Sequence, residues 1–135
     1  MSEQVTDIRF WADREKKIPD ATIFWQKAER LSQVLANQGK SNRRTQIRRF
    51  YDEVLRLDQD AKRLPEEQWP SIQARLNLLV PKAVYAWGRD NLVSEEFVEF
   101  IKNSVKQIDN KEDLAMFATF FEAFMGFYRK EKKEQ

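Results

Sequence analysis

The residues best suited to chemistry lie in one short basic stretch. Five cations and no acid occur between Lys40 and Arg49, and the aromatic pair Phe50 and Tyr51 follows directly. A Gly-Ser-Asn cluster precedes an amphipathic pattern that begins at about Arg44, so the stretch lies where a loop meets a helix start. Cations there are repelled by the helix dipole, whereas a bound anion relieves that repulsion. The stretch therefore indicates either a binding site for polynucleotide phosphate or a solvated run of charge.

A second row of cations recurs every seven residues, at Arg75, Lys82 and Arg89. Leu78 and Tyr85 share that spacing and lie beside the row. The segment between Arg75 and Arg89 contains no acid that could pair with these cations on the same helix. A cationic row beside an aromatic side chain is typical of nucleic-acid backbone sites. The alternative is that these cations pair with acids on other helices.

The composition excludes most kinds of active site. The chain has no cysteine and no histidine, so it lacks a thiol nucleophile, the commonest metal ligands and the usual near-neutral general base. The pair Gly39-Lys40 lacks the earlier glycine and the strand of a P-loop. The neighbouring acids Glu66-Glu67 and Glu95-Glu96 fall in predicted first helical turns, where acids are ordinary. We therefore predict a protein that is not an enzyme and uses no cofactor and no metal.

Apolar residues at helical spacing predict an all-α fold, a compact bundle of about five helices in a single domain. No segment alternates at period two, so no strand is expected. The predicted organisation is an N-terminal arm or short helix over 1–18, a helical bundle over 19–131 and a frayed tail over 132–135. The expected helix starts are Asp20, about Arg44, Pro65, Asn91 or Ser94, and Asn110.

Details of these helices provide further expectations. Phe24 begins the apolar stripe of the first helix and precedes Ala28 by four residues. Pro81 lies inside the third helix and removes the hydrogen bond to the Asn77 carbonyl, so a kink is expected there.

The second helix carries arginines on the side opposite its apolar stripe. These are Arg49, Arg56 and Arg63, seven residues apart. Because Asp52 and Glu53 lie within helical reach of the first two, a solvated, charge-paired face is the favoured interpretation of these arginines.

Charge is unevenly distributed along the chain. Residues 39–89 carry eleven cations against six acids, whereas residues 90–128 carry three cations against eight acids. The distribution predicts one basic and one acidic face, which suits contact with a polyanion and head-to-tail contact between copies. No unbroken apolar stretch of membrane-spanning length occurs, so a cytoplasmic protein is expected.

Three blocks of the sequence together resemble the small subunit of type III-A CRISPR–Cas effector complexes, the Csm complex. In chain order, over roughly residues 21–131, they are Thr45–Tyr51, then Pro81–Arg89, then Phe117 with Phe120–Ala123 and a late Tyr128. The resemblance implies a helical, RNA-binding structural subunit of an antiviral defence complex. It implies several copies stacked along a guide RNA–target RNA duplex, contacting the phosphates of both RNAs. It also implies contact with the backbone and large subunits and with other copies of itself.

The predicted RNA-binding residues come from two sources. The resemblance implies phosphate contacts by Arg48 and Arg49 in the first block and by Lys82 and Arg89 in the second. Charge geometry adds Lys40, Arg43, Arg44 and Arg75.

Two other classes of protein can be compared with this interpretation. The first is a helical scaffold or dimerisation protein that binds only other proteins. It is favoured by the aromatic residues Trp11, Phe120 and Phe127, which are additional to the single apolar stripe that each helix needs to pack into the core. A helix-turn-helix regulator is disfavoured, because the basic helix spans some twenty residues and a proline-marked break separates it from the next.

Overall fold

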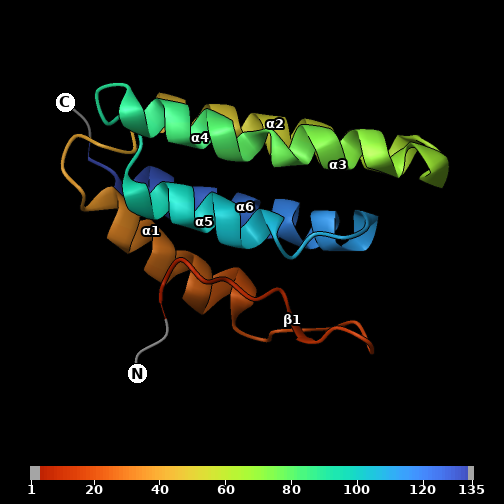
Figure 1. Ribbon diagram of the computed structural model, residues 1–135. Helices are drawn as coiled ribbons and strands as arrows, with labels where there is room; N and C mark the ends of the chain where they lie inside the picture. Colours follow the sequence, from red (N-terminus) through yellow and green to blue (C-terminus); the bar gives the residue numbers. More distant parts are fainter. Residues whose placement is uncertain (1–3, 134–135) are drawn as a thin grey trace.

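The computed structural model describes residues 4–133, which form three layers of helices (Figure 1). The upper layer contains α2, α3 and α4, the middle layer contains α5 and α6, and the lower layer contains α1 and the N-terminal segment. The all-α prediction is confirmed. The expectations for residues 1–3 and 134–135 lie outside the described residues. The helices are α1 (Ala28–Ala36), α2 (Arg44–Arg63), α3 (Trp69–Asn77), α4 (Leu79–Gly88), α5 (Glu95–Val105) and α6 (Lys111–Glu131).

Side-chain caps fix the starts of the last two helices. The Ser94 hydroxyl accepts a hydrogen bond from the Phe97 amide at 3.1 Å, and the Asn110 side chain accepts one from the Asp113 amide at 2.9 Å. Each bond satisfies a backbone donor that the helix leaves unpaired. Ser94 is therefore the cap among the two predicted candidates, while Asn91 is an exposed turn residue.

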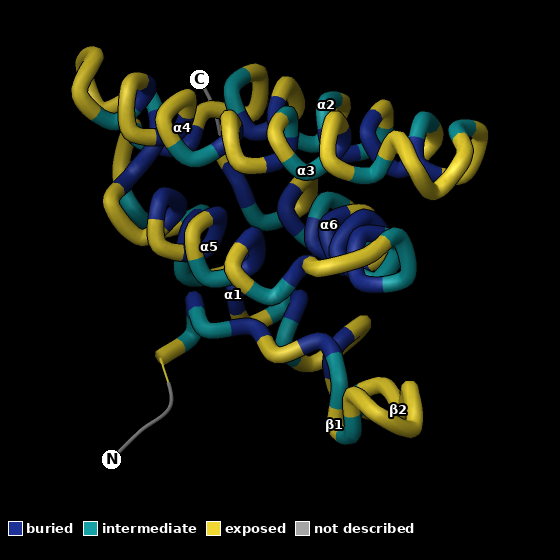
Figure 2. The backbone as a smooth tube through the Cα atoms, turned by 45° about the vertical axis from the view of Figure 1, so that its right-hand side comes forward, coloured by how far each residue is buried: buried dark blue, intermediate teal, exposed yellow. Residues whose placement is uncertain are grey.

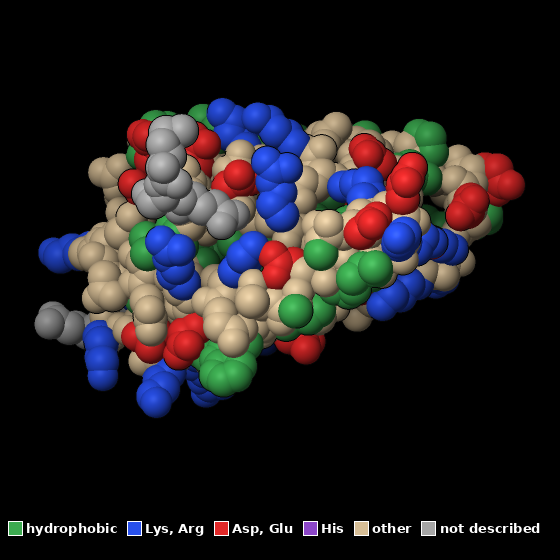
Figure 3. Space-filling view, turned by 90° about the horizontal axis from the view of Figure 1, so that it is seen from below, with side chains coloured by type: hydrophobic (Ala, Val, Ile, Leu, Met, Phe, Trp, Pro, Cys, Tyr) green, Lys and Arg blue, Asp and Glu red, His purple; other side chains and the backbone are tan. Residues whose placement is uncertain are grey.

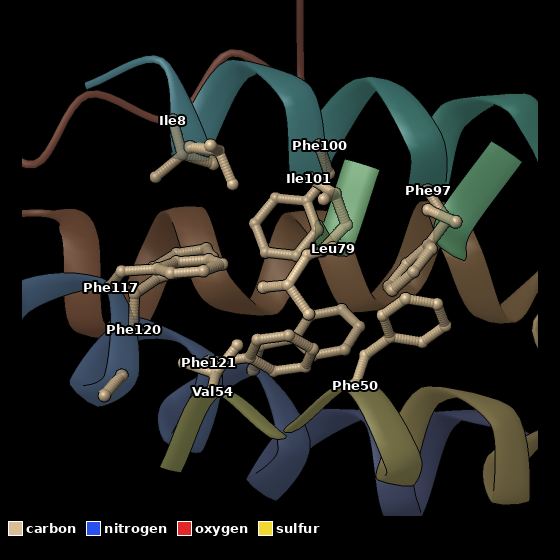
Figure 4. Close-up of a cluster of buried hydrophobic side chains, with 14 of the residues drawn as sticks. Ile8, Phe50, Val54, Leu79, Phe97, Phe100, Ile101, Phe117, Phe120 and Phe121 are labelled. Atoms are coloured by element: carbon tan, nitrogen blue, oxygen red, sulfur yellow. The ribbon is translucent and has the colours of Figure 1, made fainter. Parts of the chain in front are cut away.

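Aromatic rings from α5 and α6 fill the centre of the core (Figure 4). The Phe100 ring lies 5.6 to 6.1 Å from the rings of Phe117, Phe120, Phe121 and Phe124. The helices are buried on the sides that face one another and exposed on the outer sides (Figure 2). Because α6 packs against both α1 and α2, Phe120 is fully buried although it lies off the main apolar stripe.

The first predicted helix begins with a π-helical turn, Ile23–Lys27, before α1. The Lys27 amide donates to the Thr22 carbonyl at 3.0 Å, a bond that spans five residues instead of four. This turn shifts the buried face by one residue, so Ile23 is fully buried and Phe24 is 37% exposed. The prediction that Phe24 begins the buried stripe is therefore wrong, because it assumed α-helical spacing throughout.

Asp20 organises this helix start. Its carboxylate accepts hydrogen bonds from the amide and hydroxyl of Thr22 and forms an ion pair with Lys27. Burial acts to raise the pKa of Asp20, but the hydrogen bonds from Lys27 and Thr22 outweigh it and lower the pKa from 3.8 to about 2.

We predict a pH-dependent difference between the wild-type chain and Asp20→Asn. Since the pKa is lower in the folded state, the charged carboxylate stabilises the fold above its unfolded pKa, and that stabilisation is lost as the pH falls toward 2. Urea unfolding at pH 6 should show the variant to be less stable than wild type, and the difference should shrink below pH 4. A difference that stays constant over this range contradicts the prediction.

The third predicted helix is divided at Leu78, three residues before Pro81, and the predicted kink at Pro81 stays a prediction. The Leu78 amide donates to Ala74 and the Lys82 amide donates to Leu78, each at 3.2 Å, so helical bonding continues on both sides. Proline has no amide hydrogen to donate to Asn77. The break lets the two halves pack differently, with α3 against α2 and α4 mainly against α5.

The N-terminal arm forms a small antiparallel hairpin of β1 (Trp11–Asp13) and β2 (Ile18–Pro19). The expectation of no strand is therefore wrong. Strands of three and two residues are too short to show an alternating pattern, and the turn between them places Lys17, not glycine, at a φ of 55°.

Residues of α6 and of the turn between α5 and α6 hold the arm against the bundle. The nearly buried Asp113 carboxylate accepts hydrogen bonds from the Trp11 indole and the Arg14 guanidinium, both at 2.8 Å. Arg14 also donates to the Gln107 carbonyl at 2.7 Å, and the side chain of Gln107 donates to the Ile8 carbonyl. The arm is thus bonded to the bundle through both side chains and backbone.

The end of the chain is partly anchored as well. Lys132, which the sequence placed in a frayed tail, is 2% exposed, and its ammonium donates to the carbonyls of Gly39 at 2.9 Å and Ser41 at 2.7 Å. The turn that precedes α2 supplies these acceptors, which no sequence pattern reveals.

Candidate nucleic-acid interface

One side of α4 carries an alternation of apolar and cationic residues. Leu78, at its N-cap, is followed by Lys82, Tyr85 and Arg89 at spacings of four, three and four, which places all of them on one side of the helix. Leu78 is 49% exposed and Tyr85 is 67% exposed, the largest value among the exposed large hydrophobic residues described. The outer side of α4 is therefore a stripe of cation, aromatic ring and cation.

A polar stripe on α2 lies across from it. Gln46, Arg49, Glu53 and Arg56 follow one another at spacings of three, four and three residues. These residues and the α4 stripe line the same groove, whose volume is about 680 Å³. The groove therefore brings together two basic segments that are far apart in the sequence.

Buried apolar residues form the floor of this groove. Phe50 of α2 and Leu79 and Ala86 of α4 line it and are each less than 10% exposed. The groove opens beside α4, where that helix departs from α2 to pack against α5. Its walls are therefore set by core packing rather than by loops.

Three of the cations that line the groove have no acid partner. Among residues 4–133, no salt bridge involves Arg49, Lys82 or Arg89, whereas Arg56 lies 3.9 Å from Glu53. An unpaired cation keeps its full charge available for a ligand, because no intramolecular ion pair must be broken first. Arg49, Lys82 and Arg89 are thus the predicted site residues that the structure brings together.

Three other predicted residues lie outside the groove. Arg48 projects from α2 and pairs with Asp52 at 3.2 Å, with both side chains more than half exposed. Lys40 and Arg43 are exposed on the loop before α2 and form no salt bridge within the described part of the chain. Phosphate contact by these three stays a prediction.

Arg75 is committed to an ion pair between helices. Its guanidinium donates to Asp60 of α2 at 2.9 Å, and Arg63 donates to the same carboxylate at 3.2 Å. The hydrogen bond from Arg75, together with that from Arg63, lowers the pKa of Asp60. For Arg75, the alternative of pairing with an acid on another helix is the arrangement that the structure shows.

Arg44 is similarly engaged within the fold. Its guanidinium donates to the carbonyls of Arg129 at 3.0 Å and Lys132 at 2.7 Å, near the C-terminal end of α6. Carbonyls at this end lack helical donors and carry partial negative charge, so a guanidinium stabilises them. Arg44 thus caps α6 rather than lining the groove.

Arg56 lies on the solvated, charge-paired face that the sequence predicts, 69% exposed and 3.9 Å from Glu53, and it also lines the groove. Its separation of seven residues from Arg49 was the available signal, since that spacing puts both on one side of α2. Asp52 and Glu53 lie within helical reach of these arginines, so the sequence favoured a charge-paired face over a binding site at Arg56.

The lower face of the molecule differs in character from the groove. Figure 3 shows Lys and Arg side chains intermixed with Asp and Glu across the face formed by α1 and the N-terminal segment. Such interspersed charge produces little net field. The charge geometry therefore favours the upper layer as the anion-binding surface.

Residues 4–133 contain no group of three or more His, Cys, Asp or Glu side chains arranged to hold a metal ion. No helix in this part of the chain combines the length and apolar character that a membrane crossing requires.

Comparison with known proteins yields one match. The family described as Csm2 Type III-A matches residues 19–134, which include every helix of the bundle. Neither a curated protein nor a solved structure matches the chain.

Proposed function

The chain belongs to the Csm2 family, the small subunit of the type III-A CRISPR effector complex, and we propose that it binds RNA phosphates in the α2–α4 groove. The ligand is the guide or target RNA of that complex. The residues proposed to contact phosphate are Arg49, Lys82 and Arg89, with Arg56 beside them.

One observation carries this proposal. Three cations that have no acid partner among the described residues, Arg49 on α2 and Lys82 and Arg89 on α4 and its C-cap, line one groove. Two other predicted cations, Arg75 and Arg44, instead form contacts within the fold. Arg and Lys spaced along a groove suit a polyanion backbone, which presents a charge at every nucleotide. Because these groups do not read base edges, binding should depend on salt more than on sequence.

We also propose that the subunit is a non-catalytic structural component that contacts the backbone and large subunits and other copies of itself. Exposed apolar residues away from the groove support a role in protein contact. Trp25 is 62% exposed, and Ile18 and Phe24 are 49% and 37% exposed. Side chains of this kind are enriched at protein interfaces.

The triple variant Arg49→Ala, Lys82→Ala, Arg89→Ala tests the phosphate-binding proposal. Fluorescence anisotropy with a labelled single-stranded RNA should show affinity at least about tenfold lower at low salt. Each lost phosphate contact flattens the log–log salt dependence by about 0.7, so the slope should fall by about 2.

A second triple variant controls for net charge. Lys102→Ala, Lys106→Ala, Lys130→Ala removes the same number of exposed cations from α5, its C-cap and α6, away from the groove. Its affinity and salt slope should stay near the wild-type values. Equal losses in the two triple variants, or binding that varies with base sequence instead of salt, contradict the proposed site.

A further inference from the structure

We propose that the α2–α4 groove holds an unpaired nucleotide, with its base stacked on the ring of Tyr85 and its flanking phosphates on the surrounding cations. This inference rests on the proposed function and specifies its ligand. The groove would then bind single-stranded RNA in preference to the outer surface of a duplex.

The position of Tyr85 is the first reason. Its ring is 67% exposed and lies between Lys82, three residues before it, and Arg89, four residues after it, on one side of α4. Both neighbouring turns are helical, since the Lys82 amide donates to Leu78 and the Arg89 amide donates to Tyr85. A rigid ring between two cations matches the arrangement in which a base stacks while its backbone phosphates bind Lys and Arg.

The acids of the facing wall are the second reason. Asp52 and Glu53 line the groove together with the cations. Asp52 pairs with Arg48 at 3.2 Å and Glu53 lies 3.9 Å from Arg56, so these cations offset part of the repulsion between the carboxylates and a phosphate backbone. A carboxylate does accept hydrogen bonds from the amino group of a base edge. The mixed wall therefore suits a ligand that presents both phosphates and a base.

The apolar floor is the third reason. Leu78 is exposed at the rim, and Phe50, Leu79 and Ala86 lie beneath the two charged walls. The floor residues are almost fully buried, so the apolar surface open to a ligand is that of Leu78 and the Tyr85 ring, and the face of an unstacked base, unlike a phosphate, is apolar. In a duplex the base faces are stacked on one another and are unable to reach this surface.

Abasic RNA separates the base contact from the phosphate contacts. We would compare a single-stranded RNA of about 12 nucleotides with the same strand in which abasic ribose replaces the bases, so that the phosphate charge is unchanged. Wild-type protein should bind the intact strand about tenfold more tightly, as expected for one stacked base. The salt slopes for the two strands should be equal, because their phosphates are the same.

Substitution of Tyr85 locates this difference. Tyr85→Ala should remove the preference for the intact strand, and Tyr85→Phe should retain it, because the ring is sufficient for stacking. Trp25→Ala, which removes another highly exposed aromatic, should leave the preference intact. Circular dichroism of each variant should match wild type, since both side chains project into solvent.

The two proposals fail separately in this design. Equal binding of intact and abasic strands by wild type, or an undiminished preference in Tyr85→Ala, overturns the stacked base while phosphate binding stands. Loss of salt dependence in wild type overturns phosphate binding itself. Tighter binding of a matched duplex than of the single strand also overturns the inference.

Discussion

Replacement of Asn42 by alanine is expected to lower the free energy of unfolding by about 3 to 5 kcal/mol. Asn42 is fully buried, in the turn between α1 and α2. The two hydrogens of its side-chain NH2 are shared among three acceptors: the Leu35 carbonyl and the Ser94 hydroxyl, both at 3.0 Å, and the Gln38 side chain at 2.9 Å. Its side-chain oxygen accepts from the Ser94 amide at 2.8 Å. Alanine would leave several of these buried groups without partners.

The backbone of Asn42 adds to this expected loss. Its φ of 61° lies in the left-handed region, which costs alanine about 1 to 2 kcal/mol and asparagine less. The amide donates to the Leu92 carbonyl at 3.0 Å, and the carbonyl accepts from the Tyr128 hydroxyl. The residue thus joins the end of α1, the start of α2, the turn before α5 and the last helix.

Two variants separate these contributions. Asn42→Gly removes the side-chain bonds but tolerates the left-handed backbone, so it should be less damaging than alanine. Asn91→Ala makes the same change at an exposed residue with a φ of 52° and should cost about 1 kcal/mol. Urea unfolding at constant m-value measures each difference. Equal losses for Asn42→Ala and Asn91→Ala would show that the buried bonds contribute nothing.

Asn42 also illustrates what the sequence can and cannot reveal about the site. The Gly-Ser-Asn cluster correctly indicated a turn before the basic helix, because these residues favour left-handed backbone. Nothing in the pattern indicated that the asparagine side chain is buried against Ser94, 52 positions away. Local propensity reports a turn, whereas contacts across the fold depend on how the helices pack.

The helices were predictable because each buries one stripe of its surface. Apolar spacing predicts the bounds of α2. The side chains of Ser94 and Asn110 can accept hydrogen bonds from backbone amides, which predicts the two caps. Pro81 has no amide hydrogen, which predicts an irregularity near it. The π-helical turn before α1 was not predictable, because no residue type in this segment distinguishes a hydrogen bond that spans five residues from one that spans four. The helix begins at Ile23 with Thr22 at its N-cap, three residues after the predicted start at Asp20, and the phase of the following stripe was wrong.

The groove was only partly predictable for a similar reason. The spacing of Lys82 and Arg89 placed both on one side of a helix, and the structure places both in the groove. The same spacing included Arg75, whose partner Asp60 lies on another helix and has no periodic relation to it. Identification of unpaired cations therefore required the packing of α3 against α2.

Replacement of Phe10 by alanine is the other substitution with a large expected effect on stability. Phe10 lies on the N-terminal arm, is fully buried, and stacks on Phe117 of α6 with ring centroids 6.0 Å apart. Removing a fully buried phenylalanine ring costs about 3 to 5 kcal/mol, through lost burial and the cavity that remains. Its amide also donates to the Gln107 side chain at 3.2 Å. We expect this loss of stability for Phe10→Ala even though Phe10 lies on the N-terminal arm and not on a helix of the bundle.

Phe24→Ala is the matched control, because the same ring is partly exposed there and the expected cost is about 1 kcal/mol. Urea unfolding of both variants decides whether the arm is integral to the fold. The family match begins at residue 19, so the arm's place in the core rests on its contacts alone. If Phe10→Ala costs no more than Phe24→Ala, the arm is an accessory segment and the bundle is stable without it. If the expected difference is found, the core of this subunit extends beyond the helices that define its family, and the Asp113 contacts to Trp11 and Arg14 serve to keep Phe10 in place.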